Sequence, residues 1–124
     1  MMSYLLVFIG GGLGAALRHG VNRAVAAAGA DFPVGTLLVN VVGSLIMGLL
    51  AGWLLARGWD EHPGRLFLTS GLMGGFTTFS AFSHDAVMLW QRGATGAAAA
   101  YVAGSVVLSI LALFAGLALV RLAT

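Results

Sequence analysis

The chain has 124 residues, of which 60% are hydrophobic and 8% are charged, with a formal net charge of +2 and no cysteine. This composition is typical of an integral membrane protein, since a soluble domain carries roughly 25% charged residues. Without cysteine, disulfides and thiolate metal sites are excluded. Because about 20 apolar residues span a bilayer as a helix, we expect residues 1–124 to form one all-α domain with four transmembrane helices.

The first predicted span covers about residues 4–25 and holds the glycine-rich run Gly10–Ala15. We interpret Gly10 and Gly14 as small residues that let another helix approach closely. A phosphate-binding loop is disfavoured because no lysine follows the glycines. Arg18 lies near the end of this span and either extends to the membrane interface or forms an electropositive vestibule for an anion. The N-terminus lacks the basic region of a signal peptide, so we read it as the start of the span.

A turn containing Asp31 leads to the second predicted span, at about residues 34–56. Small and polar residues recur every fourth position and therefore lie along one helix face: Thr36, Asn40, Ser44, Gly48 and Gly52. Asn40 is distinctive, because a carboxamide in hydrocarbon needs a hydrogen-bonding partner. It either bonds a neighbouring helix or donates to a passing ion.

The polar run Asp60–Arg65 follows, and Trp53 and Trp59 flank Arg57 as in an interfacial belt. We interpret the run as a solvated loop. A metal site made by Asp60, Glu61 and His62 is the less favoured alternative.

The third predicted span, at about residues 66–89, should be interrupted near Gly74–Thr78. Glycine weakens a helix, and the hydroxyls of the adjacent threonines can bond the backbone groups that a break frees. Such a break is tolerated in a membrane only inside protein or beside a water-filled path. Phe76, Phe79 and Phe82 follow a three-residue spacing that places them on one side of a helix, as core packing or as a pore lining. His84 and Asp85 could relay protons as a buried pair, but both lie near the membrane end, where solvation is the expected state.

The fourth predicted span covers about residues 95–120. Gly96, Ala100 and Gly104 form a ridge of small residues suited to helix contact. Tyr101, Ser105 and Ser109 form a four-spaced stripe of hydroxyls, which we interpret as a polar track.

Four spans place both termini on one side of the membrane, together with Arg57, Arg65 and Arg121. Arg23 and Arg92 lie on the other side, joined by Arg18 if its side chain reaches out of the first span. Basic residues orient a membrane protein, so this near balance predicts insertion in both orientations. Two opposite copies would then pair as an antiparallel homodimer.

Three segments, Gly11–His19, Gly35–Gly43 and Gly74–Phe82, resemble the Fluc (CrcB) fluoride channels. The resemblance extends over essentially the whole chain. The sequence departs from the usual pattern at Ala81, where the family has Thr or Ser. Asp85 stands where Glu is frequent, and Phe76 replaces an aliphatic residue.

The resemblance implies a channel of the bacterial inner membrane that passively exports cytoplasmic fluoride. It also implies an antiparallel homodimer with two pores and a structural Na⁺ at its centre, bound by the backbone carbonyls of Gly74 and Thr77. The implied pore residues are Asn40, Phe79 and Phe82, with the hydroxyls of Ser80, Tyr101, Ser105, Ser109 and Thr36. Fluoride, a second copy of the chain and lipid are then its partners, and nucleic acid is not.

The main alternative is a small proton-coupled exporter of the multidrug type. Such an exporter needs a membrane-embedded carboxylate, typically in the first span, and Asp85 is the only acid inside a predicted span. A non-transporting assembly subunit has no need for Asn40 together with the phenylalanines. An enzyme is not expected, because no pair of nucleophile and base appears within the spans.

Overall fold

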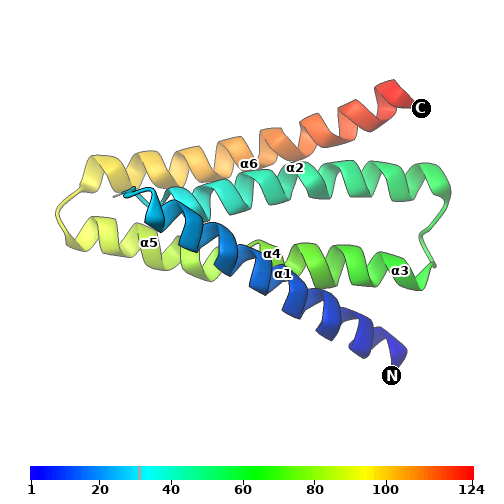
Figure 1. The fold of residues 1–124 in the computed structure, drawn as a ribbon. Coiled ribbons are helices and arrows are strands. Elements are labelled where there is room, and N and C mark those ends of the chain that lie inside the picture. Colours follow the sequence, from blue (N-terminus) through cyan, green and yellow to red (C-terminus); the bar gives the residue numbers. More distant parts are fainter. Residues whose placement is uncertain (31) are drawn as a thin grey trace.

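In the computed structural model, which describes residues 1–30 and 32–124, the chain forms four long helical segments (Figure 1). Three are continuous helices, each long and apolar enough to cross a membrane: α1 (Met2–Ala27), α2 (Val34–Arg57) and α6 (Thr95–Ala123). The remaining segment is divided into α3 (Pro63–Leu66), the π-helix η1 (Phe67–Met73), α4 (Gly74–Phe76) and α5 (Phe79–Gln91). The expected turn residue Asp31 lies outside the described residues.

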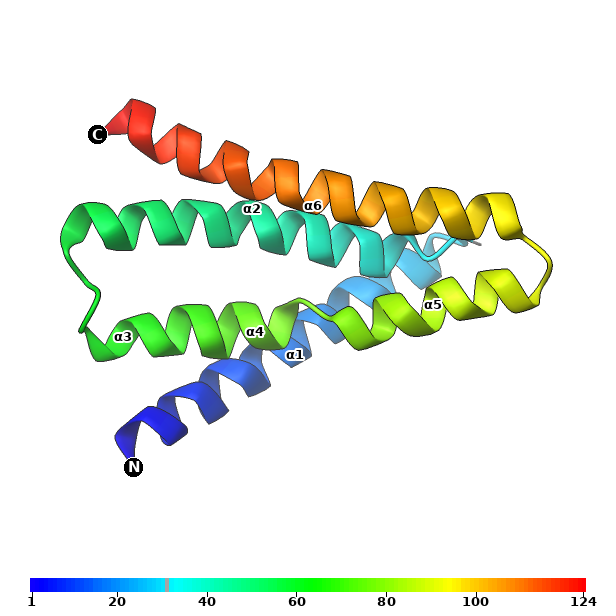
Figure 2. The same cartoon turned by 180° about the vertical axis from the view of Figure 1, so that it is seen from behind.

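The segments run alternately up and down. Helices α2 and α6 lie side by side, while α1 crosses the divided segment obliquely (Figures 1 and 2). Both termini lie at the end of the molecule that holds the α2–α3 connection. The α1–α2 and α5–α6 connections lie at the opposite end. This is the arrangement expected of four consecutive spans.

Glycines make the two closest helix contacts. A Cβ atom on Gly116 of α6 would lie 2.5 Å from the carbonyl oxygen of Leu45 in α2, and one on Gly48 would clash with the Leu113 carbonyl. On α1, a Cβ on Gly10 would lie 2.6 Å from the carbonyl oxygen of Phe67, and one on Gly14 would clash with that of Leu72. Small residues therefore let these backbones touch, as the sequence predicts for Gly10 and Gly14.

The prediction that Gly96, Ala100 and Gly104 of α6 contact another helix is wrong within this chain. A Cβ atom on Gly96 or Gly104 would meet nothing within 4 Å, and Ala100 is exposed. The neighbouring hydroxyl stripe faces inward instead, with Tyr101 only 1% exposed. Burial of the large Tyr101 ring removes far more apolar surface from solvent than burial of glycine, so this face of the helix packs inward.

The predicted interruption is present, and it lies at Thr77 and Thr78. Both residues are extended, with φ/ψ of −82°/156° and −152°/117°, whereas Gly74 and Gly75 remain helical (Figure 2). Gly75 serves packing, because a Cβ atom there would clash with the carbonyl of Gly11 in α1. The break also corrects the expectation that three phenylalanines share one helix face. Phe76 lies before the break and is buried against Val39 and Met73.

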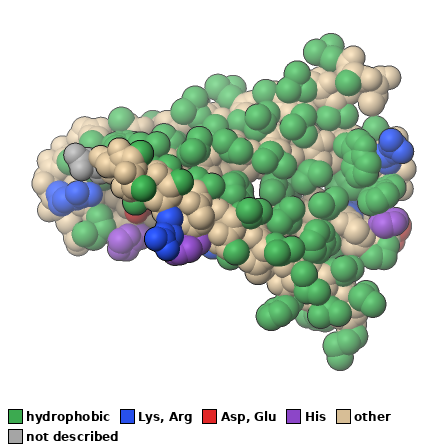
Figure 3. Space-filling view, viewed as in Figure 1, with side chains coloured by type: hydrophobic (Ala, Val, Ile, Leu, Met, Phe, Trp, Pro, Cys, Tyr) green, Lys and Arg blue, Asp and Glu red, His purple; other side chains and the backbone are tan. Residues whose placement is uncertain are grey.

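Apolar side chains cover the middle of the molecule, and the charged groups gather at its two ends (Figure 3). Exposed apolar residues of α1 and α6 include Phe8, Leu17 and Phe114. A surface that is apolar between two charged ends fits a bilayer, so the chain is a multi-pass membrane protein.

The α2–α3 connection is an ordered turn. The Trp59 ring packs edge-on to Trp53 with centroids 5.1 Å apart, and the guanidinium of Arg57 lies 5.5 Å from the Trp53 ring. His62 stacks on Trp59 at 3.8 Å, and its Nδ1 accepts the Gly64 N–H at 3.0 Å. His62 therefore caps α3. Among the described residues, no group of three or more His, Asp or Glu side chains is placed to hold a metal ion.

Candidate ion pathway

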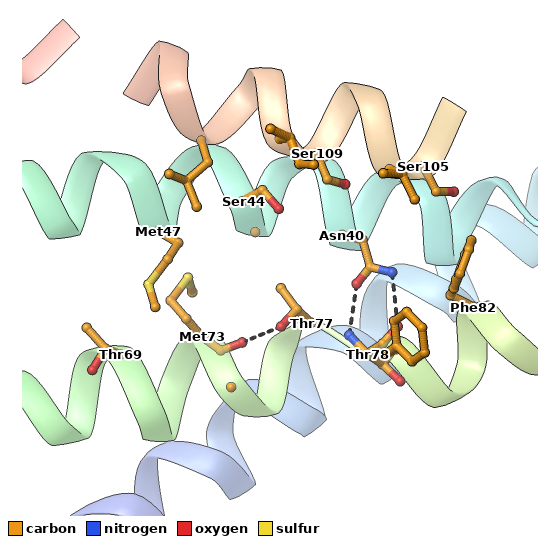
Figure 4. Close-up of a pocket in the computed structure, with 16 residues that line it drawn as sticks. Asn40, Ser44, Met47, Thr69, Met73, Thr77, Thr78, Phe82, Ser105 and Ser109 are labelled. Atoms are coloured by element: carbon orange, nitrogen blue, oxygen red, sulfur yellow. Dashed lines mark hydrogen bonds between the residues drawn. The ribbon is translucent and has the colours of Figure 1, made fainter. Parts of the chain in front are cut away.

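A cavity of about 430 Å³ lies beside the break, between α2, the divided segment and α6 (Figure 4). Seven of the pore and cation-site residues that the resemblance implies line it: Asn40, Gly74, Thr77, Phe79, Phe82, Ser105 and Ser109. Ser44, Thr69 and Thr78 add further hydroxyls, and Met47 and Met73 face one another across it (Figure 4). Polar groups from three segments therefore meet at a cavity whose wall is otherwise mostly apolar.

Asn40 of α2 bonds the backbone of the break at two points. Its Oδ1 accepts the N–H of Thr78 at 2.8 Å, and its Nδ2 donates to the carbonyl of the same residue at 3.0 Å (Figure 4). Of the two roles left open for Asn40, the bond between helices is therefore present. One of the two Nδ2 hydrogens is used in it, and the carboxamide carries a second.

The break frees the two carbonyls that the resemblance assigns to a cation. In a continuous α-helix the N–H of Thr78 would bond the Gly74 carbonyl, and the N–H of Ala81 would bond the Thr77 carbonyl. Here the first donates to Asn40, and the second donates to Thr78 Oγ1 at 3.2 Å, as an N-cap of α5. Side chains have thus taken the donors that these two carbonyls would otherwise have.

Arg18 turns inward to the break. Its half-buried side chain donates from Nε to the carbonyl of Gly75 at 3.1 Å. The sequence suggested either the interface or a vestibule for Arg18, and this backbone contact was not foreseen. The two residues are 57 positions apart, and no local pattern links them.

The phenylalanines that follow the break differ in their surroundings. The rings of Phe79 and Phe82 have centroids 5.4 Å apart and planes at 49°. Phe82 is 8% exposed and lies 5.3 Å from the Tyr101 ring, whereas Phe79 is 78% exposed. Both line the cavity, one from the packed interior and the other from the open edge.

Beyond Phe82, Tyr101 donates from its hydroxyl to Asp85 Oδ2 at 3.2 Å. Asp85 is partly buried, and its Oδ1 lies 3.8 Å from Nδ1 of the exposed His84. The expectation of a simply solvated Asp85 is therefore wrong. The tyrosine sixteen positions later reaches it because α5 and α6 pack together at this end. Thr36 is also buried, outside the cavity lining.

The remaining hydroxyls are placed in two ways. Ser105 is 6% exposed and lines the cavity, and no hydrogen-bond partner for its Oγ lies among the described residues. Ser80 is exposed, and its Oγ lies 3.3 Å from Thr78 Oγ1, outside the cavity lining. The structure therefore brings Ser105 and Ser109 together with Asn40 and leaves Ser80 at the edge.

These features define a small multi-pass membrane protein with an interrupted span beside a cavity that is lined in part by polar side chains. Broken helices bind ions at sites of this kind. Residues 5–117 match the family described as CrcB-like protein, Camphor Resistance (CrcB), and the chain belongs to that family.

Similar proteins carry a more specific name. The chain is 60% identical to the fluoride-specific ion channel FluC 2 of Nitrobacter hamburgensis, over 97% of this chain and 98% of the relative. It is 55% identical to the fluoride-specific ion channel FluC of Methylobacterium nodulans, over 98% of each chain. It is 56% identical to the FluC protein of Rhodopseudomonas palustris, over 99% of this chain and all of the relative.

Proposed function

We propose that this protein is a fluoride-specific ion channel of the bacterial inner membrane, through which cytoplasmic fluoride leaves passively. The observation that carries the proposal is 60% identity to a fluoride-specific channel over nearly the full length of both chains. The cavity supports it, because its lining offers donors suited to a small anion.

The proposed pathway runs along the cavity beside α5. Fluoride is strongly hydrated, so a pore must replace water with good hydrogen-bond donors. The second Nδ2 hydrogen of Asn40 is such a donor, and so is the hydroxyl of Ser105, which has no partner among the described residues. The ring edges of Phe79 and Phe82 carry positive partial charge and would attract the anion weakly. Ser109 would continue the track on one side.

Three further hydroxyls complete the proposed track outside the cavity. Tyr101 is buried against Phe82, Thr36 is buried as well, and Ser80 lies beside Thr78. The Arg18 guanidinium would add positive potential to the vestibule, because its bond to a neutral carbonyl leaves its charge uncompensated.

A structural Na⁺ fits the break. The carbonyls of Gly74 and Thr77 have lost their helical donors, and unwound carbonyls of this kind coordinate Na⁺ in other broken-helix proteins. One chain offers two such oxygens, so the site would be completed by the same pair from a second copy. The bound ion would supply positive charge and would link the two copies rigidly.

An antiparallel homodimer with two pores is the proposed assembly. Phe79 is 78% exposed although it lines the cavity, so one chain leaves the pathway open on that side. A second copy related by a two-fold axis in the membrane plane would close both pathways identically.

Fluoride efflux from liposomes that contain only this protein tests the function. A fluoride electrode should record passive release, with chloride retained in the same vesicles. Equal release of both anions would contradict fluoride specificity, and a requirement for a proton gradient would favour the exporter alternative.

A further inference from the structure

We infer that Asn40 is a positioning residue for the cation site: its carboxamide keeps the span broken at Thr78 and so keeps the Gly74 carbonyl free to bind Na⁺. This inference rests on the proposed function. It extends that function from the oxygens that would bind the ion to the side chain that makes them available.

Two acceptors compete for one backbone donor at the break. The N–H of Thr78 has two possible acceptors, the Gly74 carbonyl in a continuous helix and Oδ1 of Asn40 in the broken one. The structure has the second bond at 2.8 Å. Whichever acceptor wins decides whether the Gly74 oxygen is occupied by its own helix or left for a cation.

Asn40 also serves the other polar group of Thr78. An extended residue exposes its N–H and C=O, and an unsatisfied backbone group in a membrane interior is costly. Asn40 bonds both groups, at 2.8 and 3.0 Å, much as a neighbouring β-strand would. Without the carboxamide, the cheapest way to satisfy Thr78 is to rebuild the helix, which would consume the Gly74 carbonyl.

The packing of α2 holds the carboxamide in register with the break. Val39 is fully buried, and a Cβ atom on Gly43 would clash with the Thr77 side chain, so α2 lies directly against the extended residues. On the opposite side, Arg18 occupies the Gly75 carbonyl. Side chains of α1 and α2 therefore occupy the carbonyls of Gly75 and Thr78, while the donors for Gly74 and Thr77 are diverted.

A simpler reading makes Asn40 only a fluoride contact, and two substitutions separate the readings. Asn40→Asp keeps an oxygen that can accept the Thr78 N–H, whereas it repels fluoride and loses the amide donor. Asn40→Ser keeps a hydroxyl donor for the anion, but its side chain is too short to accept the Thr78 N–H, the bond that leaves the Gly74 carbonyl free. If Asn40 positions the cation site, Asn40→Asp should bind Na⁺ more tightly than Asn40→Ser. If Asn40 contacts fluoride, Asn40→Ser should release fluoride faster than Asn40→Asp.

The experiment measures the thermal unfolding temperature of the full-length protein in detergent as Na⁺ replaces N-methylglucamine at constant ionic strength. The Na⁺ concentration for half-maximal stabilisation should rise by about 10- to 100-fold in Asn40→Ser and in the near-isosteric Asn40→Leu, the usual effect of removing a group that orients metal ligands. It should stay near the wild-type value in Asn40→Asp, whose charge also favours a cation. The control is Asn22→Leu, which changes the other asparagine of the chain. Asn22 lies on α1 beside Gly35 of α2, and its substitution should leave the half-maximal Na⁺ concentration unchanged.

Folded Asn40→Ser or Asn40→Leu protein with the wild-type Na⁺ dependence would overturn the inference, as would a wild-type protein indifferent to Na⁺. If Asn40→Leu does not fold, the comparison of Ser with Asp decides. Efflux from liposomes is measured in parallel on every variant. Normal wild-type efflux with no Na⁺ effect would leave the channel proposal standing without the inference. The expected Na⁺ ranking without any fluoride efflux would support the role of Asn40 at the cation site and contradict the channel proposal.

Discussion

The polar side chains around the break differ in what they bond. Asn40, Arg18 and Thr78 are bonded to main-chain groups of the break and thus set its geometry. Ser105 is buried on the facing helix with no partner among the described residues. A buried hydroxyl without a partner costs free energy, so its presence at the cavity wall is explained if a passing anion accepts a hydrogen bond from it.

Substitution of Ser105 should therefore separate stability from transport. Ser105→Ala removes an unsatisfied buried hydroxyl, so the free energy of unfolding should stay unchanged or rise by up to about 1 kcal/mol. Fluoride efflux should nevertheless become slower. Ser83→Ala is the control, because that hydroxyl bonds the Phe79 carbonyl and lies outside the cavity lining. Unchanged efflux in a stable Ser105→Ala protein would remove Ser105 from the pathway.

The two phenylalanines should respond differently to Ile. Phe82 is packed against Tyr101, so Phe82→Ile should cost about 1 kcal/mol of stability. Phe79 is exposed in one chain, so Phe79→Ile should cost the single chain little stability. If both ring edges contact fluoride, both substitutions should slow efflux severely while the dimer still forms. Phe79→Tyr should be tolerated better than Phe82→Tyr, since only the first has room for a hydroxyl. Efflux rate against dimer yield is the measurement, and stable Ile variants with normal efflux would leave both rings as packing.

The divided third segment is the element that gives the molecule its site. Its π-helix η1 and α4 pack against α1 through Gly10 and Gly75, and its extended residues pack against α2. A helix that is closely held on both sides of an interruption keeps the break at one position. The break is thus a property of three helices together.

Sequence alone predicted the segments and an interruption near Gly74–Thr78, because composition and glycine content are local signals. It attributed the break to the glycine pair, whereas Gly75 is a contact residue and the threonines are the extended ones. It also missed Arg18 at the Gly75 carbonyl and Tyr101 at Asp85. Those bonds depend on which helix faces meet, and a sequence without its packing does not contain that information.

Gly75→Ala should lower the stability of the fold more than alanine at a glycine of α1 that faces open space. A Cβ atom at Gly75 would clash with the Gly11 carbonyl, and such overpacking typically costs about 1–3 kcal/mol. Gly12→Ala is the matched control. A Cβ there meets nothing within 4 Å, and the better helix propensity of alanine should stabilise α1 by up to about 1 kcal/mol. Thermal unfolding of both variants in detergent is the measurement, and equal unfolding temperatures would contradict the contact.

At the scale of the whole molecule, the charges of the two ends are nearly balanced. Arg57 at the end of α2, Arg65 in α3 and Arg121 near the end of α6 belong to the end with both termini, and Arg23 near the end of α1 and Arg92 after α5 belong to the opposite end. Arg18 adds to neither end, because its side chain donates to the Gly75 carbonyl inside the molecule. Because a difference of one arginine gives little bias to insertion, we predict that the chain inserts in both orientations, as the antiparallel dimer proposed above requires.

Two added lysines should therefore abolish the function without touching the pathway. Asp60→Lys with Glu61→Lys places them on exposed positions of the α2–α3 connection, and the Arg65 bond to the Asp60 carbonyl is retained. This end should then stay cytoplasmic, as a C-terminal reporter would show, and cells should lose fluoride efflux because no opposite copy is made. The converse pair, Gln91→Lys with Thr95→Lys, should be equally inactive alone. Co-expression of the two variants should restore efflux, because each supplies the orientation that the other lacks. A single orientation of the unmodified chain, or full efflux from either variant alone, would contradict pairing of opposite copies.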